Sequence, residues 1–230
     1  MEQASEQHQR IVNTLLSKSC MKQDVFHRTM DLFKDLKEEL EGVVSRLAAD
    51  TSGKDERLAL HYRDRGEHGC EARIAGDLVI FQMHTNVFRL DQGHSLWRTS
   101  YLEEDETRGY FGVVNVFNFL NDSFKYNRER DLGYLVARIF LNKEGHFFVQ
   151  GKKQLGFLYN DLVNATLDRA GLRAILESVV LHVLEFDLLA PPYDQANQVT
   201  VSEMNELRAA PVSTGKRLGF RFQADDPPQG

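Results

Sequence analysis

The chain has little cysteine and no long apolar run. Its two cysteines, Cys20 and Cys70, are too few for a disulfide framework. No stretch approaches the roughly 18 consecutive apolar residues of a membrane-spanning helix, and the initial MEQASEQHQR lacks the apolar segment of a secretory signal. We therefore expect a soluble protein in a reducing cytoplasm, with no membrane association.

An excess of positive charge is also missing, since the formal net charge is −6 at pH 7. An acidic chain is poorly suited to a phosphate-binding surface that spans the whole domain. Nucleic acid is thus an unexpected partner, unless a local basic patch provides the contact.

Familiar catalytic and cofactor motifs are absent as well. The sequence contains no G-x-S-x-G, G-x-x-x-x-G-K-[ST], G-x-G-x-x-G or H-E-x-x-H pattern. The sequence motifs therefore identify no catalytic residues and do not decide whether the protein is an enzyme. We expect no cofactor and no bound metal.

Two segments have apolar residues at helical spacing. One runs from Asp24, which suits an N-cap, to about residue 49, and its apolar stripe is wide enough to pack across a sheet and to leave a surface for a partner chain. The other covers residues 171–190 and is ended by APP, because proline cannot continue a helix.

Between these helices the apolar period changes to two, which predicts strands. The predicted strands cover residues 57–63, 70–75, 78–84, 95–101, 109–117, 133–141 and 146–151. Short Gly-, Asp- and Asn-containing turns separate most of them, as in an antiparallel meander. The predicted fold class is α+β: an antiparallel meander sheet of about six or seven strands, packed by a long N-terminal helix and a C-terminal helix.

The same patterns divide the chain into three parts. Residues 1–22 form a polar N-terminal segment with a short helix, residues 23–190 a single α+β domain, and residues 191–230 a polar, partly disordered extension. The residues predicted to be buried in the core are Leu32, Leu36, Leu40, Ile74, Phe81, Val114, Ile139, Leu176 and Val183.

The stretch HYRDRGEHGCEARIAGDLVIFQMH, residues 61–84, raises the question of a metal site, since it holds three histidines and one cysteine. A two-residue turn at Gly76-Asp77 would pair Ile74 with Val79 and Cys70 with Met83. Cross-strand partners share a face of the sheet. Cys70 and His84 therefore point to opposite faces and do not bind one metal.

A second hairpin is predicted around Asn142, with a three-residue loop that ends at Gly145 in the left-handed conformation. Its apolar face would include Leu135, Ala137 and Ile139. The opposite face mixes Phe140 and Phe148 with polar side chains.

Five side chains on the polar strand faces are candidates for binding a small ligand. They are His61, Arg73, His84, Arg138 and His146. If they converge, the protein is an enzyme or a small-ligand-binding domain with a pocket on this face.

The stretch SFKYNRER (123–130) interleaves aromatic and basic side chains, a pattern that can hold single-stranded nucleic acid by stacking and phosphate contact. The candidate residues are Phe124, Lys125, Tyr126, Arg128 and Arg130. The negative net charge of the whole chain argues against this hypothesis.

The favoured hypothesis is a non-enzymatic binding or scaffold module that acts as a homodimer and binds a protein partner. It depends on the missing catalytic motifs and on the wide apolar stripe of the N-terminal helix, part of which a second copy would bury.

Overall fold

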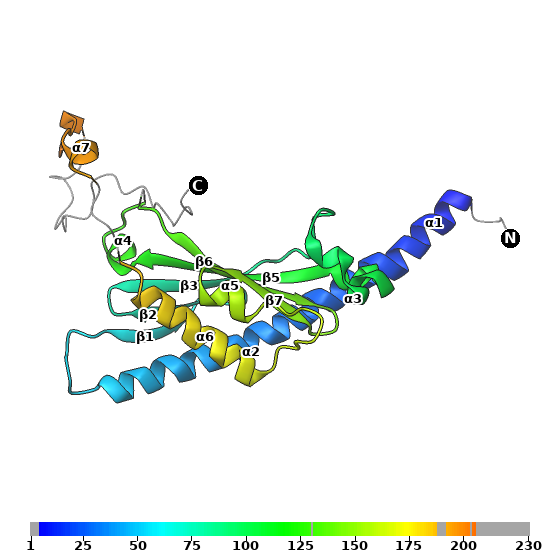
Figure 1. Ribbon diagram of the computed structural model, residues 1–230, viewed down its shortest axis with the longest axis horizontal. Coiled ribbons are helices and arrows are strands. Elements are labelled where there is room, and N and C mark those ends of the chain that lie inside the picture. Colours follow the sequence, from blue (N-terminus) through cyan, green and yellow to red (C-terminus); the bar gives the residue numbers. More distant parts are fainter. Residues whose placement is uncertain (1–4, 130, 188–191, 203, 206–230) are drawn as a thin grey trace.

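A computed structural model describes residues 5–129, 131–187, 192–202 and 204–205 of the chain. These residues form a seven-stranded antiparallel sheet with two long helices on one face (Figure 1). The predicted α+β class and the packing by an N-terminal and a C-terminal helix are confirmed.

A single helical rod makes up the N-terminal part of the protein. Its successive parts are α1 (Glu6–Thr14), a wide π-helical turn η1 (Leu15–Ser19) and α2 (Cys20–Thr51), and it starts at Ser5, whose hydroxyl accepts a bond from the His8 amide. The predicted start at Asp24 is wrong. Met21 and Val25 both pack on Tyr110 of the sheet, so this contact stabilises helix on both sides of Asp24.

The sheet has the strand order β1-β2-β3-β5-β6-β7, and every neighbouring pair is antiparallel, as a meander requires. The strands are β1 (Leu60–Asp64), β2 (Gly69–Ile74), β3 (Asp77–Met83), β4 (Phe88–Arg89), β5 (Tyr110–Leu120), β6 (Tyr134–Asn142) and β7 (Phe147–Gly151). Short β4, which the sequence pattern did not indicate, pairs with the start of β5.

Residues 95–101, predicted as a strand, are helical. They lie in η2 (Ser95–Arg98) and α3 (Ser100–Glu104), and η3 (Glu106–Gly109) follows. The neighbours Tyr101 and Leu102 are both buried. A strand would send consecutive side chains to opposite faces, whereas a helical turn can bury both.

The β2–β3 hairpin keeps the predicted faces but not the predicted pairs. Its turn residues are Ala75, at φ 53°, and Gly76, so Ile74 pairs with Asp77 and Cys70 with Phe81. This register differs by two residues from the predicted one. Because side chains alternate with a period of two, each residue stays on its face.

The β6–β7 hairpin has the predicted loop, with Gly145 at φ 86°. However, the β5–β6 ladder shifts register between Val116 and Phe117, so that Val136 is an extra residue in β6. Val136 is buried, and Leu135 pairs with Phe117 on the opposite face and is 42% exposed. The predicted inward orientation of Leu135 is therefore wrong.

The inner face of the sheet carries the main core, against α2 and α6 (Arg169–Leu184). All nine core residues predicted above are buried. Helix α6 begins after Asp168, which caps the Gly171 amide, and ends before the predicted residue 190, since Phe186 packs against Tyr134 of the sheet.

The remaining helices are short: α4 (Asn121–Lys125), α5 (Gln154–Leu158) and α7 (Tyr193–Ala196). Helix α4 is the helical turn within the long connection between β5 and β6. Most of the predicted C-terminal extension, residues 206–230, lies outside the described residues.

Candidate binding surface

The outer face of the sheet has two halves, and one of them is closed. Residues 95–109 cover the end of this face and enclose an aromatic cluster. The Phe140 and Phe148 rings stack with centroids 4.5 Å apart, and the Phe111 ring meets Phe148 edge-on at 5.4 Å. This half is a second, smaller core, which residues 95–109 cover.

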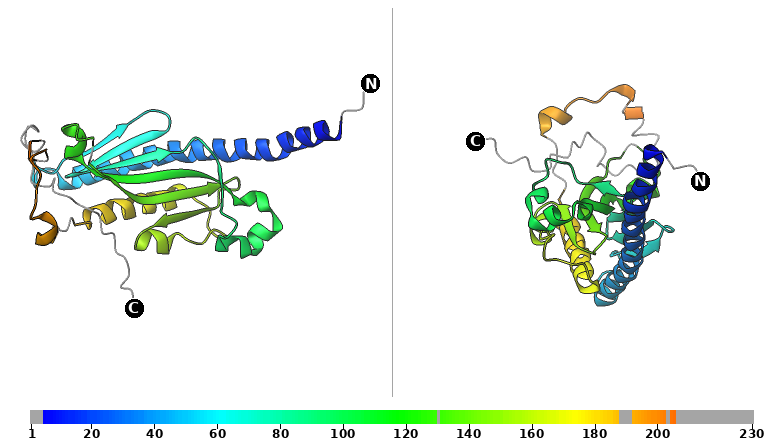
Figure 2. Two further views of the ribbon diagram at one scale, coloured as in Figure 1. Left: turned by 90° about the horizontal axis from the view of Figure 1, so that it is seen from above. Right: turned by 90° about the vertical axis from the view of Figure 1, so that its right-hand side faces the viewer.

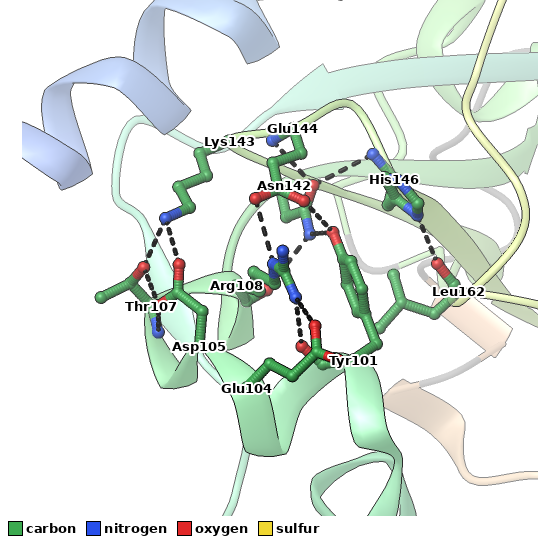
Figure 3. Close-up of polar contacts among 10 residues, drawn as sticks. All are labelled: Tyr101, Glu104, Asp105, Thr107, Arg108, Asn142, Lys143, Glu144, His146 and Leu162. Carbon is green, nitrogen blue, oxygen red and sulfur yellow. Dashed lines mark hydrogen bonds and ion pairs between the residues drawn. The ribbon is translucent and has the colours of Figure 1, made fainter.

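A polar network fastens residues 95–109 to the sheet (Figure 3). At its centre is Asn142, which is fully buried. Its amide nitrogen donates to the Tyr101 hydroxyl at 2.9 Å and the Arg108 carbonyl oxygen at 3.3 Å. Its amide oxygen accepts from the backbone N–H groups of Glu144 and His146, both at 3.0 Å.

Glu144 extends the network toward solvent. It accepts a bond from the Tyr101 hydroxyl at 2.8 Å and pairs with Arg108 at 3.0 Å. Burial opposes ionisation of this carboxyl, but the bonds from Tyr101 and Arg108 outweigh it and lower its pKa. Burial also raises the pKa of Tyr101 to about 12, so the hydroxyl remains a donor at neutral pH.

The outer part of the network is an ion pair between Lys143 and Asp105, whose atoms lie 2.6 Å apart. The bonds from Lys143 and then Thr107 lower the pKa of Asp105 to about 2. These groups bond to one another rather than toward an open site. The network therefore acts as a clasp that closes one half of the outer face.

The other half of the outer face is open and consists of two rows that cross the strands. The polar row is Gln82, Asn115, Arg138 and Gln150, which follow one another as register partners on β3, β5, β6 and β7. The apolar row is Ile80, Phe117 and Leu135. Every member of both rows is half-buried or exposed.

Arg138 is the cation of the polar row. Its guanidinium donates to the Gln150 side-chain oxygen and lies 5.4 Å from the centroid of the Phe140 ring. Within the part of the chain that the structure describes, no carboxylate contacts it. The site thus presents one cation among three amides, beside the half-buried Ile80 and Phe117 and the exposed Leu135.

The five predicted ligand residues do not converge. His61 on β1 and Arg73 on β2 are register partners, and they lie four and three strand spacings, about 19 and 14 Å, from the β6 strand of Arg138. His84 follows β3, where its ring accepts a bond from the Asn86 amide. His146 stacks on Tyr101 at 4.7 Å and bonds the Leu162 carbonyl, inside the clasp.

Among these five, only Arg138 belongs to the polar row. Sequence reasoning missed its neighbour Asn115 and the apolar neighbour Phe117. Strand alternation within 109–117 places both on the outer face, so that signal was present. Their position beside Arg138 depends on the strand order, which no local pattern contains.

The connection after β5 holds the residues proposed for nucleic acid. Phe124 and Lys125 are exposed, and Tyr126 is half-buried. Arg128 is buried and pairs with Asp131 at 2.7 Å, so its guanidinium is engaged within the connection. Arg130 lies outside the described residues.

In the described ranges, no three His, Cys, Asp or Glu side chains are grouped so that they could hold a metal ion. None of the helices found there combines the length and the apolar composition needed to cross a membrane.

No family model matches the chain, and it matches no curated protein and no solved structure. The class of the protein is therefore defined by its own architecture. It is an α+β protein with an antiparallel meander sheet, helices on the inner face and a half-open outer face.

Proposed function

We propose that the protein is a non-enzymatic binding or scaffold module that acts as a homodimer and binds a protein partner on the open half of its outer sheet face. The observation that carries this proposal is the pair of adjacent rows, one polar and one apolar, across β3, β5 and β6. Interfaces favour aromatic and arginine side chains, and Phe117 and Arg138 supply them here.

The chemistry of the rows suits a peptide-like surface. Side-chain amides such as Gln82 and Asn115 both donate and accept hydrogen bonds, as peptide groups do. The apolar row beside them offers burial for a partner's apolar side chain. The clasp fastens the neighbouring half to the sheet through hydrogen bonds and ion pairs, and a surface that is already ordered binds at a lower entropic cost.

We place this module in the cytoplasm. Cys20 is exposed and Cys70 is buried, and both are free thiols. Free exposed thiols are typical of reducing compartments.

The alternative is a small-ligand site on the same face. Arg138 with its amide neighbours resembles the donor sets that hold carboxylates. An acidic small molecule would then occupy the polar row, and the protein would be a ligand-binding domain or an enzyme.

Native mass spectrometry of the purified, untagged protein tests these functions. We expect a dimer without a bound small molecule. A monomer that carries a stoichiometric acidic molecule would contradict the proposal and favour the alternative. In that case Arg138→Ala should remove the molecule, whereas Arg63→Ala, which changes an exposed arginine on β1, should retain it.

A further inference from the structure

Helix α1 projects beyond the body of the protein. In two perpendicular views it continues the line of α2 past the end of the sheet (Figures 1 and 2). None of its residues is buried, and the first buried residue of the rod is Met21. At 1.5 Å per residue, the part before Met21 is about 20 Å long.

The projecting part carries an unpaired apolar face. Ile11 is 52% exposed and Leu15 is 55% exposed. They follow one another at i, i+4 and thus lie on the same side of the helix. With Gln7, Arg10 and Thr14 they line a shallow groove along α1.

Basic side chains gather where this face meets the body. Lys18 lies in the π-helical turn that begins at Leu15, Lys22 lies one turn further along the rod, and their ammonium groups lie 6.0 and 5.8 Å from the centroid of the Tyr110 ring. The Arg89 guanidinium lies 5.9 Å from the same centroid. The other end of α1 carries Glu6 in its first turn, and the positively charged Arg10 follows one turn later in the groove.

We propose that the α1 helices of two copies pair antiparallel, so that Ile11 of each chain meets the partner's Leu15. This inference rests on the homodimer of the proposed function and specifies its interface. A two-fold axis then passes at the level of residue 13. Each Glu6 lies at the level of the partner's residue 20, between the partner's Lys18 and Lys22.

The charges select a second copy and an antiparallel orientation. Glu6 on one side of the apolar centre and Lys18 and Lys22 on the other are complementary to the same surface turned by a half-turn, and Arg10 then lies at the level of the partner's uncharged residue 16. A parallel pair would place Lys18 beside the partner's Lys18, and Glu6 beside the partner's Glu6. Both contacts are repulsive.

The first experiment measures mass by light scattering, with size-exclusion chromatography, for two matched substitutions. Leu15→Asp adds a charge at the proposed centre, and Leu181→Asp adds it at a leucine of similar exposure, 48%, on α6. We expect the wild type and Leu181→Asp to be dimers and Leu15→Asp to be a monomer. Circular dichroism should show all three folded, because both leucines are exposed.

The outcomes separate the two proposals. If Leu15→Asp stays dimeric, the α1 interface is wrong while the homodimer stands. If the wild type is a monomer at every concentration, both the homodimer and this interface are wrong.

Disulfide trapping tests the orientation. In a Cys20→Ser background, Thr14→Cys places thiols close to the two-fold axis, and mild oxidation should link the dimer. Gln7→Cys lies in the same groove, but antiparallel pairing separates the two copies of residue 7 by about 18 Å, far beyond disulfide reach. Efficient linking through Gln7→Cys, without linking through Thr14→Cys, would overturn the antiparallel pairing.

Discussion

Replacement of Asn142 by alanine tests whether the clasp holds the outer segment on the sheet. The side chain is fully buried and makes four hydrogen bonds. Its removal leaves the backbone N–H groups of Glu144 and His146 without their acceptor. Each unsatisfied buried group costs about 1–3 kcal/mol. Because water can reach these partly buried groups, we expect a loss of about 2–4 kcal/mol in the free energy of unfolding.

Urea unfolding followed by circular dichroism measures this loss. The matched control is Asn164→Ala, since the Asn164 side chain bonds only the exposed Asp161 carboxylate and should cost under about 0.5 kcal/mol. A second readout is the emission of Trp97, the one tryptophan, which lies in the segment 95–109 that covers the outer face. It should shift to the red in Asn142→Ala before the sheet unfolds. A loss equal to that of the control, with unchanged emission, would refute the role assigned to the clasp.

Three further predictions concern the core, the ion pair and a close backbone contact. Leu36→Ala should lower the free energy of unfolding by about 2–5 kcal/mol, measured in urea, because Leu36 is fully buried between helix and sheet; an unchanged midpoint would contradict the core assignment. Asp105 has a lowered pKa in the folded state, so its contribution is present above the ordinary carboxyl pKa of about 4 and is lost as the pH falls toward about 2. Unfolding measured across this range should show a larger loss for the wild type than for Lys143→Met, and equal losses would argue against the pair. Gly112→Ala should cost about 1–3 kcal/mol in thermal unfolding, because a Cβ there would overlap the Thr29 side chain; adding Thr29→Ala should restore part of this loss, and no recovery would point to another cause.

Local patterns in the sequence determined much of the architecture. Side-chain alternation assigned Ile74, Phe81 and Ile139 to the buried face, and it did so even though the β2–β3 pairs are offset by two residues. A period of two makes the face insensitive to such an offset. The loop at Gly145 followed from its chemistry, since glycine adopts positive φ without steric cost.

Other features depended on contacts between distant segments. The start of the long helix is set by Tyr110, which packs on Met21 and Val25. Leu135 faces outward because β5 and β6 pair with a bulge, and a bulge is a property of two strands together. Residues 95–101 are helical because they cover an aromatic cluster built from β5, β6 and β7.

The sequence by itself determined the class of fold, the core and the type of side chain on each face of the sheet. These follow from periodicity, which is a local property of a strand or a helix. Only the tertiary structure decided which polar side chains are neighbours. Strand order places Arg138 beside Asn115 and Gln82 and leaves His61 four strands away, because side chains on a sheet meet through ladder pairing rather than through their positions in the chain.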